Sequence, residues 1–352
     1  MDDKNSAHIL LKNRYKLEKI IGSGGIAVIY LAQDTLLERI IDCHILRKKY
    51  SDDQLVQNRF KFEAKSAANL SHPNIVAVYD FGYDAGRLFI IMEYVNGSDL
   101  KTLMRKKGIF SQKESVRLIT QACEGLDYAH NNGIIHCDVK PHNFIITKDD
   151  KLKITDFGIA QALTNINSRE KHDIVWGSPL YFSPEQAAGK APSKSSDIYS
   201  LGVILYEMIT GKPPFVSDDA NELIMLHRSK KPIPPIEINK NVLPELNNIT
   251  LKILSKDPSS RYRTISQLKN ALSSLNFHNN LEQQTIISKK PEIIERAKSD
   301  TQRINLIKNK KVIPNQGIDW ATIGLTLLAL IALSGLIPFW IYVWLSLYPP
   351  GS

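Results

Sequence analysis

The segment His136-Cys137-Asp138-Val139-Lys140-Pro141-His142-Asn143 is followed, thirteen residues after Asn143, by Asp156-Phe157-Gly158. Asn143 and Asp156 carry amide and carboxylate oxygens, which are the ligands that Mg²⁺ prefers beside the phosphates of a nucleotide. Asp138 and Lys140 stand two positions apart and combine a proton acceptor with a cation. The order and spacing of these four side chains therefore predict a site that handles phosphate groups.

Apolar runs at residues 144–146 and 152–154 lie between the two segments and are typical of short strands. Two such segments at this spacing are far more specific than either alone, and they resemble the signature of the eukaryotic-type Ser/Thr protein kinases of bacteria. The resemblance covers residues 15–275, roughly three quarters of the chain. It implies an α+β fold with two lobes, namely a β-rich N-lobe at residues 15–95 and a helical C-lobe at residues 96–275.

The resemblance also implies an activity. This is the transfer of the γ-phosphoryl group of Mg-ATP to Ser or Thr hydroxyls of protein substrates, with Mn²⁺ as an alternative metal. Asp138 would act as the base, Lys140 would neutralise the transferring phosphoryl group, and Asn143 and Asp156 would hold the metal. Lys140 followed by Pro141 resembles the Ser/Thr pattern rather than the Tyr pattern.

A glycine cluster, Gly22-Ser23-Gly24-Gly25, lies between strand-like runs at residues 15–21 and 26–32. Glycines let a backbone lie close over phosphates and offer N–H groups to them. Taken alone, such a cluster is more often an ordinary hairpin turn, and the third glycine position of the family is Ala27 here. The resemblance implies the following nucleotide-binding positions: Ile21, Gly22, Ser23, Gly24, Gly25, Ile29, His44, Glu63, Met92, Glu93 and Val95.

Hydrophobic periodicity predicts the remaining elements of the two lobes. Two further strands are expected at residues 39–46 and 88–95, the second leading into a hinge at residues 93–95. Apolar residues at helical spacing predict helices at residues 55–70, 114–130 and 196–210.

The family places a lysine on the third strand of the N-lobe, and here that position is His44, within Ile41-Asp42-Cys43-His44. Imidazole is shorter than a lysine side chain and mostly neutral at pH 7, so it cannot easily span Glu63 and the phosphates together. Asp42 lies on the same strand face, because side chains two residues apart point to the same side. A carboxylate there must be paired, solvated or protonated. Both departures predict altered nucleotide binding.

Two ways of replacing the lysine remain open. A protonated His44 between Glu63 and the triphosphate would serve partly as the lysine does, and activity would then decline as the pH rises through an elevated pKa. Alternatively, a cation reaches in from another position: Arg39, Arg47, Lys48 or Lys49. The rival to an active enzyme is a pseudokinase, whose lobes bind other proteins as a signalling scaffold or regulator.

Other positions that match the family concern the architecture of the site. Cys137 replaces the arginine that binds a phosphorylated activation loop in many members, and the activation segment 156–185 has no Thr-x-Thr cluster, so we expect no switching by loop phosphorylation. The resemblance implies an ion pair between Glu185 and Arg261, and it places Asp197 on a helix that supports the catalytic loop.

Composition excludes some other classes of protein. The chain has 352 residues, of which 43% are hydrophobic and 23% charged, so disorder cannot dominate. The net charge of +9 comes without an aromatic-interleaved basic stripe, and we expect no nucleic-acid partner. The cysteines show neither metal-ligand spacing nor a disulfide framework, which favours reduced cytosolic thiols at Cys43, Cys123 and Cys137.

The C-terminal part predicts a membrane anchor. Residues 318–348 form an apolar run whose only charged residue is Asp319, long enough for one transmembrane helix, with a buried core helix as the alternative. The linker 276–317 carries eight Lys or Arg against four Asp or Glu and predicts contact with anionic membrane lipid. Lysines before the span place the kinase-like domain in the cytoplasm, on a single-pass anchor in the cell membrane. The tail 1–14 lacks a signal-peptide pattern, residues 349–352 form a short outer tail, and a homodimer is an alternative assembly.

Overall fold

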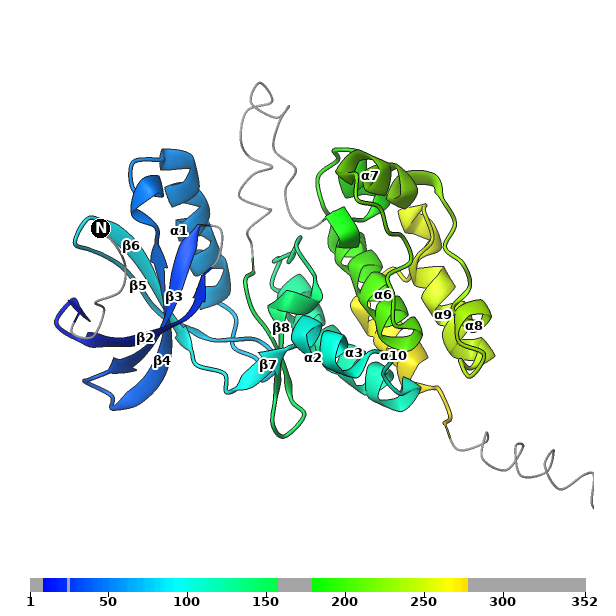
Figure 1. Cartoon of the computed structure of the whole chain (residues 1–352), viewed down its shortest axis with the longest axis horizontal. Coiled ribbons are helices and arrows are strands. Elements are labelled where there is room, and N and C mark those ends of the chain that lie inside the picture. The colour runs from blue at the N-terminus through cyan, green and yellow to red at the C-terminus, as the bar shows by residue number, and fades with distance from the viewer. Residues whose placement is uncertain (1–8, 24–25, 158–178, 278–352) are drawn as a thin grey trace, which may run out of the picture. The chain divides into compact units, whose positions relative to one another are not determined.

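The computed structural model describes residues 9–23, 26–157 and 179–277. All of them lie in one unit, Met1–His278. Figure 1 shows a β-rich lobe, coloured in blues, and a lobe of helices, coloured from cyan through green to yellow. The two-lobed α+β architecture predicted from the sequence is therefore confirmed.

The N-lobe contains a six-stranded sheet in the order β1-β2-β3-β4-β6-β5, in which every neighbouring pair is antiparallel. Its strands are β1 (Leu10–Leu11), β2 (Tyr15–Ser23), β3 (Ala27–Asp34), β4 (Arg39–Leu46), β5 (Val78–Asp84) and β6 (Arg87–Glu93). The strands predicted at residues 15–21, 26–32 and 39–46 are confirmed as β2, β3 and β4. The strand predicted at residues 88–95 is β6, which ends two residues earlier, at Glu93.

Strand β4 separates two apolar clusters, because its alternate side chains point to opposite faces of the sheet. Ile41, Cys43 and Ile45 belong to a cluster formed with β1, β2, β3 and β6. Leu46 belongs to the other cluster, which includes Phe60 of helix α1 (Gln54–Ala68). The helix predicted at residues 55–70 is therefore confirmed as α1, and it covers the face of β4 that Leu46 shares with Asp42 and His44. A short helical turn, η1 (Lys48–Tyr50), connects β4 to α1.

The C-lobe is built around α6 (Lys194–Thr210), whose residues 196–210 are all buried. A β-carbon added to Gly202 would meet Ile253 Cγ2 at 2.3 Å, so α6 and α9 pack at close range here. The helices predicted at residues 114–130 and 196–210 are confirmed as α3 (Gln112–Asn131) and α6. The other helices in the described part of this lobe are α2 (Leu100–Lys107), α5 (Pro184–Ala187), α7 (Ala220–Ser229), α8 (Pro235–Ile238), α9 (Pro244–Ile253) and α10 (Ile265–Ser273). Two short turns, η3 (Pro179–Tyr181) and η4 (Pro258–Ser260), complete the lobe.

A second, three-stranded sheet carries the catalytic segments. Its strands are β7 (Gly97–Asp99), β8 (Phe144–Thr147) and β9 (Leu152–Ile154), in that order. The turn η2 (Pro141–Asn143) leads directly into β8. The segment between α1 and β5 contacts the outer strand β9 of this sheet, where Val76 N donates to Ile154 O at 2.9 Å and Ile75 forms a bridge with Ile154.

The predicted membrane anchor is not covered by the described residues. The span 318–348, the tail 349–352 and the linker from residue 278 onward lie outside them. Within residues 9–23, 26–157 and 179–277, no helix has the length and apolar character to cross a membrane.

Candidate active site

The catalytic segment forms a short loop that leads into η2 and β8. Lys140 Nζ donates to Asp138 Oδ2 at 2.5 Å, and the two side chains keep 24% and 10% of their surface exposed. Asn143 Nδ2 donates to the backbone oxygen of Asp138 at 2.9 Å. The structure thus brings together the three residues expected to act in catalysis, and it leaves the carboxylate and the ammonium group accessible to a ligand.

Asp197 fixes the backbone of this loop. Its carboxylate is 1% exposed and accepts hydrogen bonds from His136 N and Cys137 N, both at 2.9 Å. His130 Nε2 lies 2.7 Å from the same carboxylate. Because α6 carries Asp197 in the middle of the lobe, the loop is anchored to the most buried helix of the structure. The supporting position expected for Asp197 is confirmed.

Asp156 follows β9 and has a backbone φ of +63°, a left-handed conformation that is uncommon for residues other than glycine. Thr155 N donates to Asn143 O at 3.0 Å, which links the two expected metal-binding residues through adjacent backbone. Phe157 is 1% exposed, and its ring centroid lies 4.7 Å from that of His136. Buried packing of Phe157 therefore holds the unusual backbone at Asp156, while Gly158 lies outside the described residues.

Asn143 and Asp156 fit a Mg²⁺ site. The amide nitrogen of Asn143 is engaged by the backbone of Asp138, which leaves its oxygen to face a metal. Mg²⁺ is usually held by one or two protein oxygens together with phosphates and water. No group of three or more His, Cys, Asp or Glu side chains suited to a metal occurs in the described part of the chain, so phosphate oxygens would have to complete the coordination.

The glycine cluster connects β2 and β3, as expected for a turn over phosphates. Gly22 of β2 pairs with Ile29 of β3, and Ile29 in turn pairs with His44 of β4. Gly24 and Gly25 lie outside the described residues, whereas Ile21, Gly22 and Ser23 form the end of β2. The described positions are thus placed together at one end of the sheet, next to His44.

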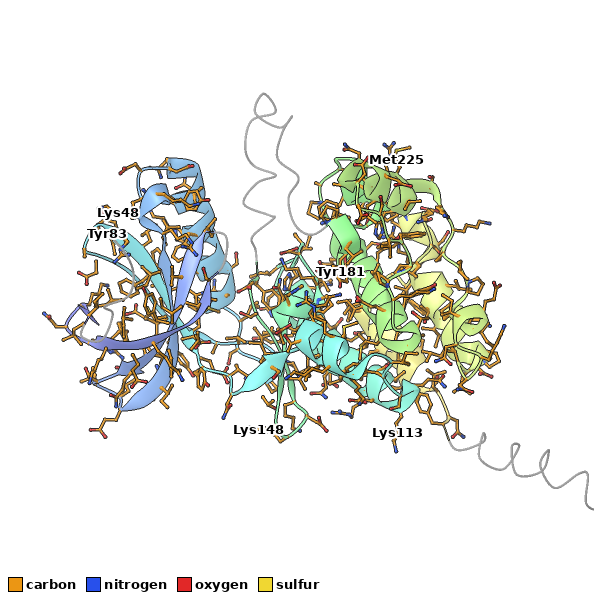
Figure 2. All side chains as sticks on the ribbon, viewed as in Figure 1. Lys48, Tyr83, Lys113, Lys148, Tyr181 and Met225 are labelled. Atoms are coloured by element: carbon orange, nitrogen blue, oxygen red, sulfur yellow. The ribbon has the colours of Figure 1, made fainter. Side chains whose placement is uncertain are left out.

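Arg47 contacts this turn. Its guanidinium group donates to Ser23 Oγ, and its backbone N–H donates to Ile26 O at 2.9 Å. Arg39 sits at the opposite end of β4, with its Cζ atom 3.6 Å from the ring centroid of Tyr79. Lys48, labelled in Figure 2, and Lys49 are exposed in η1. Of the four alternative cations, Arg47 is the one with a contact to the described residues of the glycine-rich turn.

His44 is partly buried between β3 and β6, opposite Ile29 and Ile90. Burial lowers the pKa of His44 below its usual value, and the nearby charge of Asp156 opposes this lowering only in part. The described groups therefore do not supply the elevated pKa of the protonated-His44 hypothesis, which depends on Glu63 and a bound triphosphate and stays a prediction. At pH 7 these groups favour a neutral imidazole at the position where the family has a lysine.

The hinge follows β6, and Glu63 lies within α1. Met92 is 3% exposed at the end of β6, and the partly buried Val95 packs against the apolar cluster that contains Met92 and Leu46. Glu93 Oε2 accepts from Lys153 Nζ at 2.9 Å, an ion pair between β6 and β9 that the sequence analysis missed. Alternation in β9 gave a signal for it, since Lys153 must point away from Leu152 and Ile154. Glu63 lies within α1, but its side chain is outside the described part, so its ion pair stays a prediction.

The activation segment is described only at its two ends, because residues 158–178 lie outside the described ranges. Cys137 lies in the catalytic loop that precedes this segment; it is 5% exposed with a φ of +67°, and burial raises the pKa of its thiol. At the end of the activation segment, both terminal guanidinium nitrogens of Arg261 donate to Glu185 at 2.9 Å, which confirms this ion pair.

A further ion pair supports the same region. Tyr181, labelled in Figure 2, donates its hydroxyl to Glu207 Oε2 at 2.8 Å. Lys101 Nζ donates to Glu207 Oε1 at 2.6 Å, and so connects α2 to α6. Sequence spacing gave no signal for this contact, because its residues come from three separate elements.

Comparison with known proteins agrees with this geometry. Residues 15–272 match the protein kinase domain family. The serine/threonine-protein kinase PknB of Mycolicibacterium smegmatis is 41% identical over 264 residues, which are 74% of this chain and 42% of that protein. A probable serine/threonine-protein kinase of Clostridium acetobutylicum is 40% identical over 278 residues, 78% of this chain and 42% of that protein. The crystal structure of the Mycobacterium tuberculosis PknI kinase domain aligns with a TM-score of 0.61 at 25% identity and covers 76% of this chain and 98% of that one.

The two lobes, the loop around Asp138 and the family match together define a protein kinase. The chain belongs to the protein kinase family, and within it the chain is similar to bacterial serine/threonine kinases of the PknB type. It spans about two fifths of the length of the curated relatives that it matches, 42% for both of those described above.

Proposed function

We propose that the chain is a serine/threonine protein kinase that transfers the γ-phosphoryl group of Mg-ATP to hydroxyls of protein substrates. The observation that carries this proposal is the 2.5 Å contact of Lys140 with Asp138, in a loop fixed by the buried Asp197. Similarity to serine/threonine kinases over 74% of the chain supports Ser and Thr as the acceptors.

Each group of the loop has a defined task in this reaction. Asp138 orients the substrate hydroxyl and accepts its proton, because its carboxylate is accessible, contacts Lys140 and stands on a backbone held by Asn143. Lys140 neutralises charge on the phosphoryl group during its transfer. Mg²⁺, when bound at Asn143 and Asp156, supplies further positive charge to the phosphates.

Arg47 compensates in part for the missing lysine. A neutral His44 offers a hydrogen bond but no permanent charge to a phosphate oxygen. The guanidinium of Arg47 is always charged and already reaches Ser23 of the turn that would cover the phosphates. We therefore assign Arg47, rather than Arg39, Lys48 or Lys49, as the replacing cation.

A pseudokinase is the second candidate. It is favoured by two features of β4, the lowered pKa of His44 and the buried, unpartnered oxygen of Asp42. In this alternative the lobes form a protein-binding platform, and the loop residues keep their geometry without supporting transfer.

The proposal includes a membrane anchor. Residues 318–348 would form the single span and the linker 276–317 would contact anionic lipid, with the kinase domain in the cytoplasm. The apolar run and the lysines before it support this arrangement. A homodimer stays an alternative for the assembly.

The test is phosphorylation of a Ser/Thr peptide by the full-length chain with Mg-ATP. We expect measurable transfer by the wild type and loss of transfer in Asp156→Asn, which serves as the inactive reference. We expect His44→Lys to raise the rate by at least about tenfold, because a permanent charge at this position would stabilise the transition state by about 1.4 kcal/mol or more. Arg47→Met should lower the rate.

Two outcomes separate the kinase from the pseudokinase, and a third tests the role of Arg47. Transfer by the wild type that is lost in Asp156→Asn supports the kinase. A wild type as inactive as Asp156→Asn, combined with an active His44→Lys, supports the pseudokinase. Unchanged activity in Arg47→Met would contradict the role given to Arg47.

A further inference from the structure

Asp42 occupies the middle of β4, between a leucine and a methionine. Its cross-strand neighbours are Leu31 on β3 and Met92 on β6. Met92 is 3% exposed and is followed directly by the hinge at residues 93–95. Asp42 thus lies on the sheet beside the segment in which the resemblance implies nucleotide-binding positions, namely Met92, Glu93 and Val95, and it is one alternating position closer to the hinge than His44.

The face on which Asp42 lies follows from the packing of its strand. Ile41 and Cys43 belong to the apolar cluster on one side of β4, whereas Leu46 and Met92 belong to the cluster on the α1 side. Even-numbered residues of β4 therefore face the α1 side, and Asp42 is among them. Ile145 of β8 and Val95 of the hinge pack against this same cluster. Asp42 consequently lies on the face of β4 that packs with apolar residues of β6, β8 and the hinge.

The carboxyl group of Asp42 is not satisfied by its surroundings. Its Oδ1 atom is buried and has no hydrogen-bond partner among the described residues. Burial raises the pKa of Asp42 to about 7. A carboxyl group with this pKa is neutral in about half of the molecules at neutral pH, which is unusual for an aspartate.

Charged neighbours do not account for the raised pKa of Asp42. On the same face, His44 is kept neutral by burial. Across β6, Glu93 is paired with Lys153 of β9, and Asp156 acts on His44 rather than on Asp42. Leu31 on β3 carries no charge, and the side chain of Glu63 on α1 lies outside the described part.

A planar base placed under Asp42 would remove the remaining water from the carboxyl group. An ionised carboxylate without a partner is strongly disfavoured in such a place, whereas a neutral carboxyl group can both donate and accept a hydrogen bond. We propose that Asp42 is a specificity-determining residue of the nucleotide site, which admits the base only beneath the neutral carboxyl group and takes up a proton when the nucleotide binds. This inference rests on the proposed function, since it requires that the cleft binds ATP.

The experiment measures binding of Mg-ATP to the full-length chain by calorimetry between pH 6 and pH 8.5. For the wild type we expect the affinity to fall about 30-fold over this range, because the neutral form becomes scarce above a pKa of about 7. Near pH 8 the binding heat should depend on the ionisation heat of the buffer, which reports uptake of close to one proton.

Two comparisons test whether Asp42 is the group that takes up the proton when ATP binds. Asp42→Asn has nearly the same shape and cannot ionise, so its ATP affinity should lose most of the pH dependence and match the low-pH affinity of the wild type. Inorganic tripolyphosphate lacks the base but shares the titrating phosphates. Its affinity should change with pH equally in the wild type and in Asp42→Asn.

The outcomes separate this inference from the proposed function. Binding of ATP with the same pH dependence in wild type and Asp42→Asn would overturn the role of Asp42 and leave the kinase proposal intact. A difference between the two proteins that appears equally with tripolyphosphate would also overturn it, because Asp42 would then act on the phosphates. Absence of ATP binding at every pH would overturn both proposals. Thermal melting at pH 6 checks that Asp42→Asn is folded.

Discussion

Replacing Asp138 by Asn is expected to lower the rate of phosphate transfer by about 10²–10⁴-fold, the usual contribution of a positioned proton acceptor. The amide keeps the shape of the side chain but cannot accept the proton of the substrate hydroxyl. Lys140, which now donates to Asp138 Oδ2 at 2.5 Å, can still contact an amide oxygen. The loop should therefore stay folded, and the loss should appear in kcat rather than in the affinity for ATP. Initial rates with a Ser/Thr peptide provide the measurement.

Asp149→Asn is the matched control for this prediction. Asp149 is another aspartate of the C-lobe, exposed in the turn between β8 and β9, where it accepts a hydrogen bond from Thr147 Oγ1 at 2.7 Å. Its replacement should leave the rate within about a factor of two. An Asp138→Asn protein with a rate close to that of the wild type would exclude Asp138 as the proton acceptor.

Sequence patterns predicted the N-lobe well where the strands alternate. Strand β4 was predicted at residues 39–46 and is observed at Arg39–Leu46, because Ile41, Cys43 and Ile45 alternate onto one apolar face. Strand β5 was missed. It contains aspartates and Gly82, where a β-carbon would meet the Phe89 ring at 2.5 Å. This strand owes its conformation to pairing with β6 rather than to a pattern of its own.

In the candidate site, too, features that depend on neighbouring residues in sequence were predicted, whereas features that depend on packing against other elements were not. Spacing alone identified the loop of Asp138, and alternation predicted that Asp42 and His44 share a face. Their burial could not be read from the strand, because it depends on β3, β6 and α1. For His44 this burial outweighs the charge of Asp156 and lowers the pKa of the imidazole. Arg47 likewise could not be preferred over Arg39 before strand pairing placed it beside Ser23, 24 residues away in sequence.

Arg261→Ala is expected to lower the free energy of unfolding by about 3–5 kcal/mol, the usual effect of removing one partner of a buried ion pair. Arg261 is 3% exposed and donates to Glu185 through two hydrogen bonds of 2.9 Å. It also donates to the backbone oxygens of Ser255, Lys256 and Ser195. The variant would leave all of these acceptors in the C-lobe without their donor. Urea unfolding followed by circular dichroism measures the loss.

The pH dependence of this loss provides an independent check. Burial by itself would raise the pKa of Glu185, but the hydrogen bonds and charge of Arg261, together with a hydrogen bond from Ser196, outweigh it and leave the pKa below its usual value of 4.5. A carboxyl group with a lowered folded-state pKa stabilises the protein above its unfolded-state pKa, and this contribution disappears as the pH falls through the folded-state pKa. The difference between wild type and Arg261→Ala should therefore be full at pH 7 and shrink below about pH 4.5. Arg263→Ala, at an exposed position two residues away, should change the stability by less than about 0.5 kcal/mol at either pH. A loss in Arg261→Ala that does not shrink in acid would assign the stabilisation to the backbone acceptors rather than to Glu185.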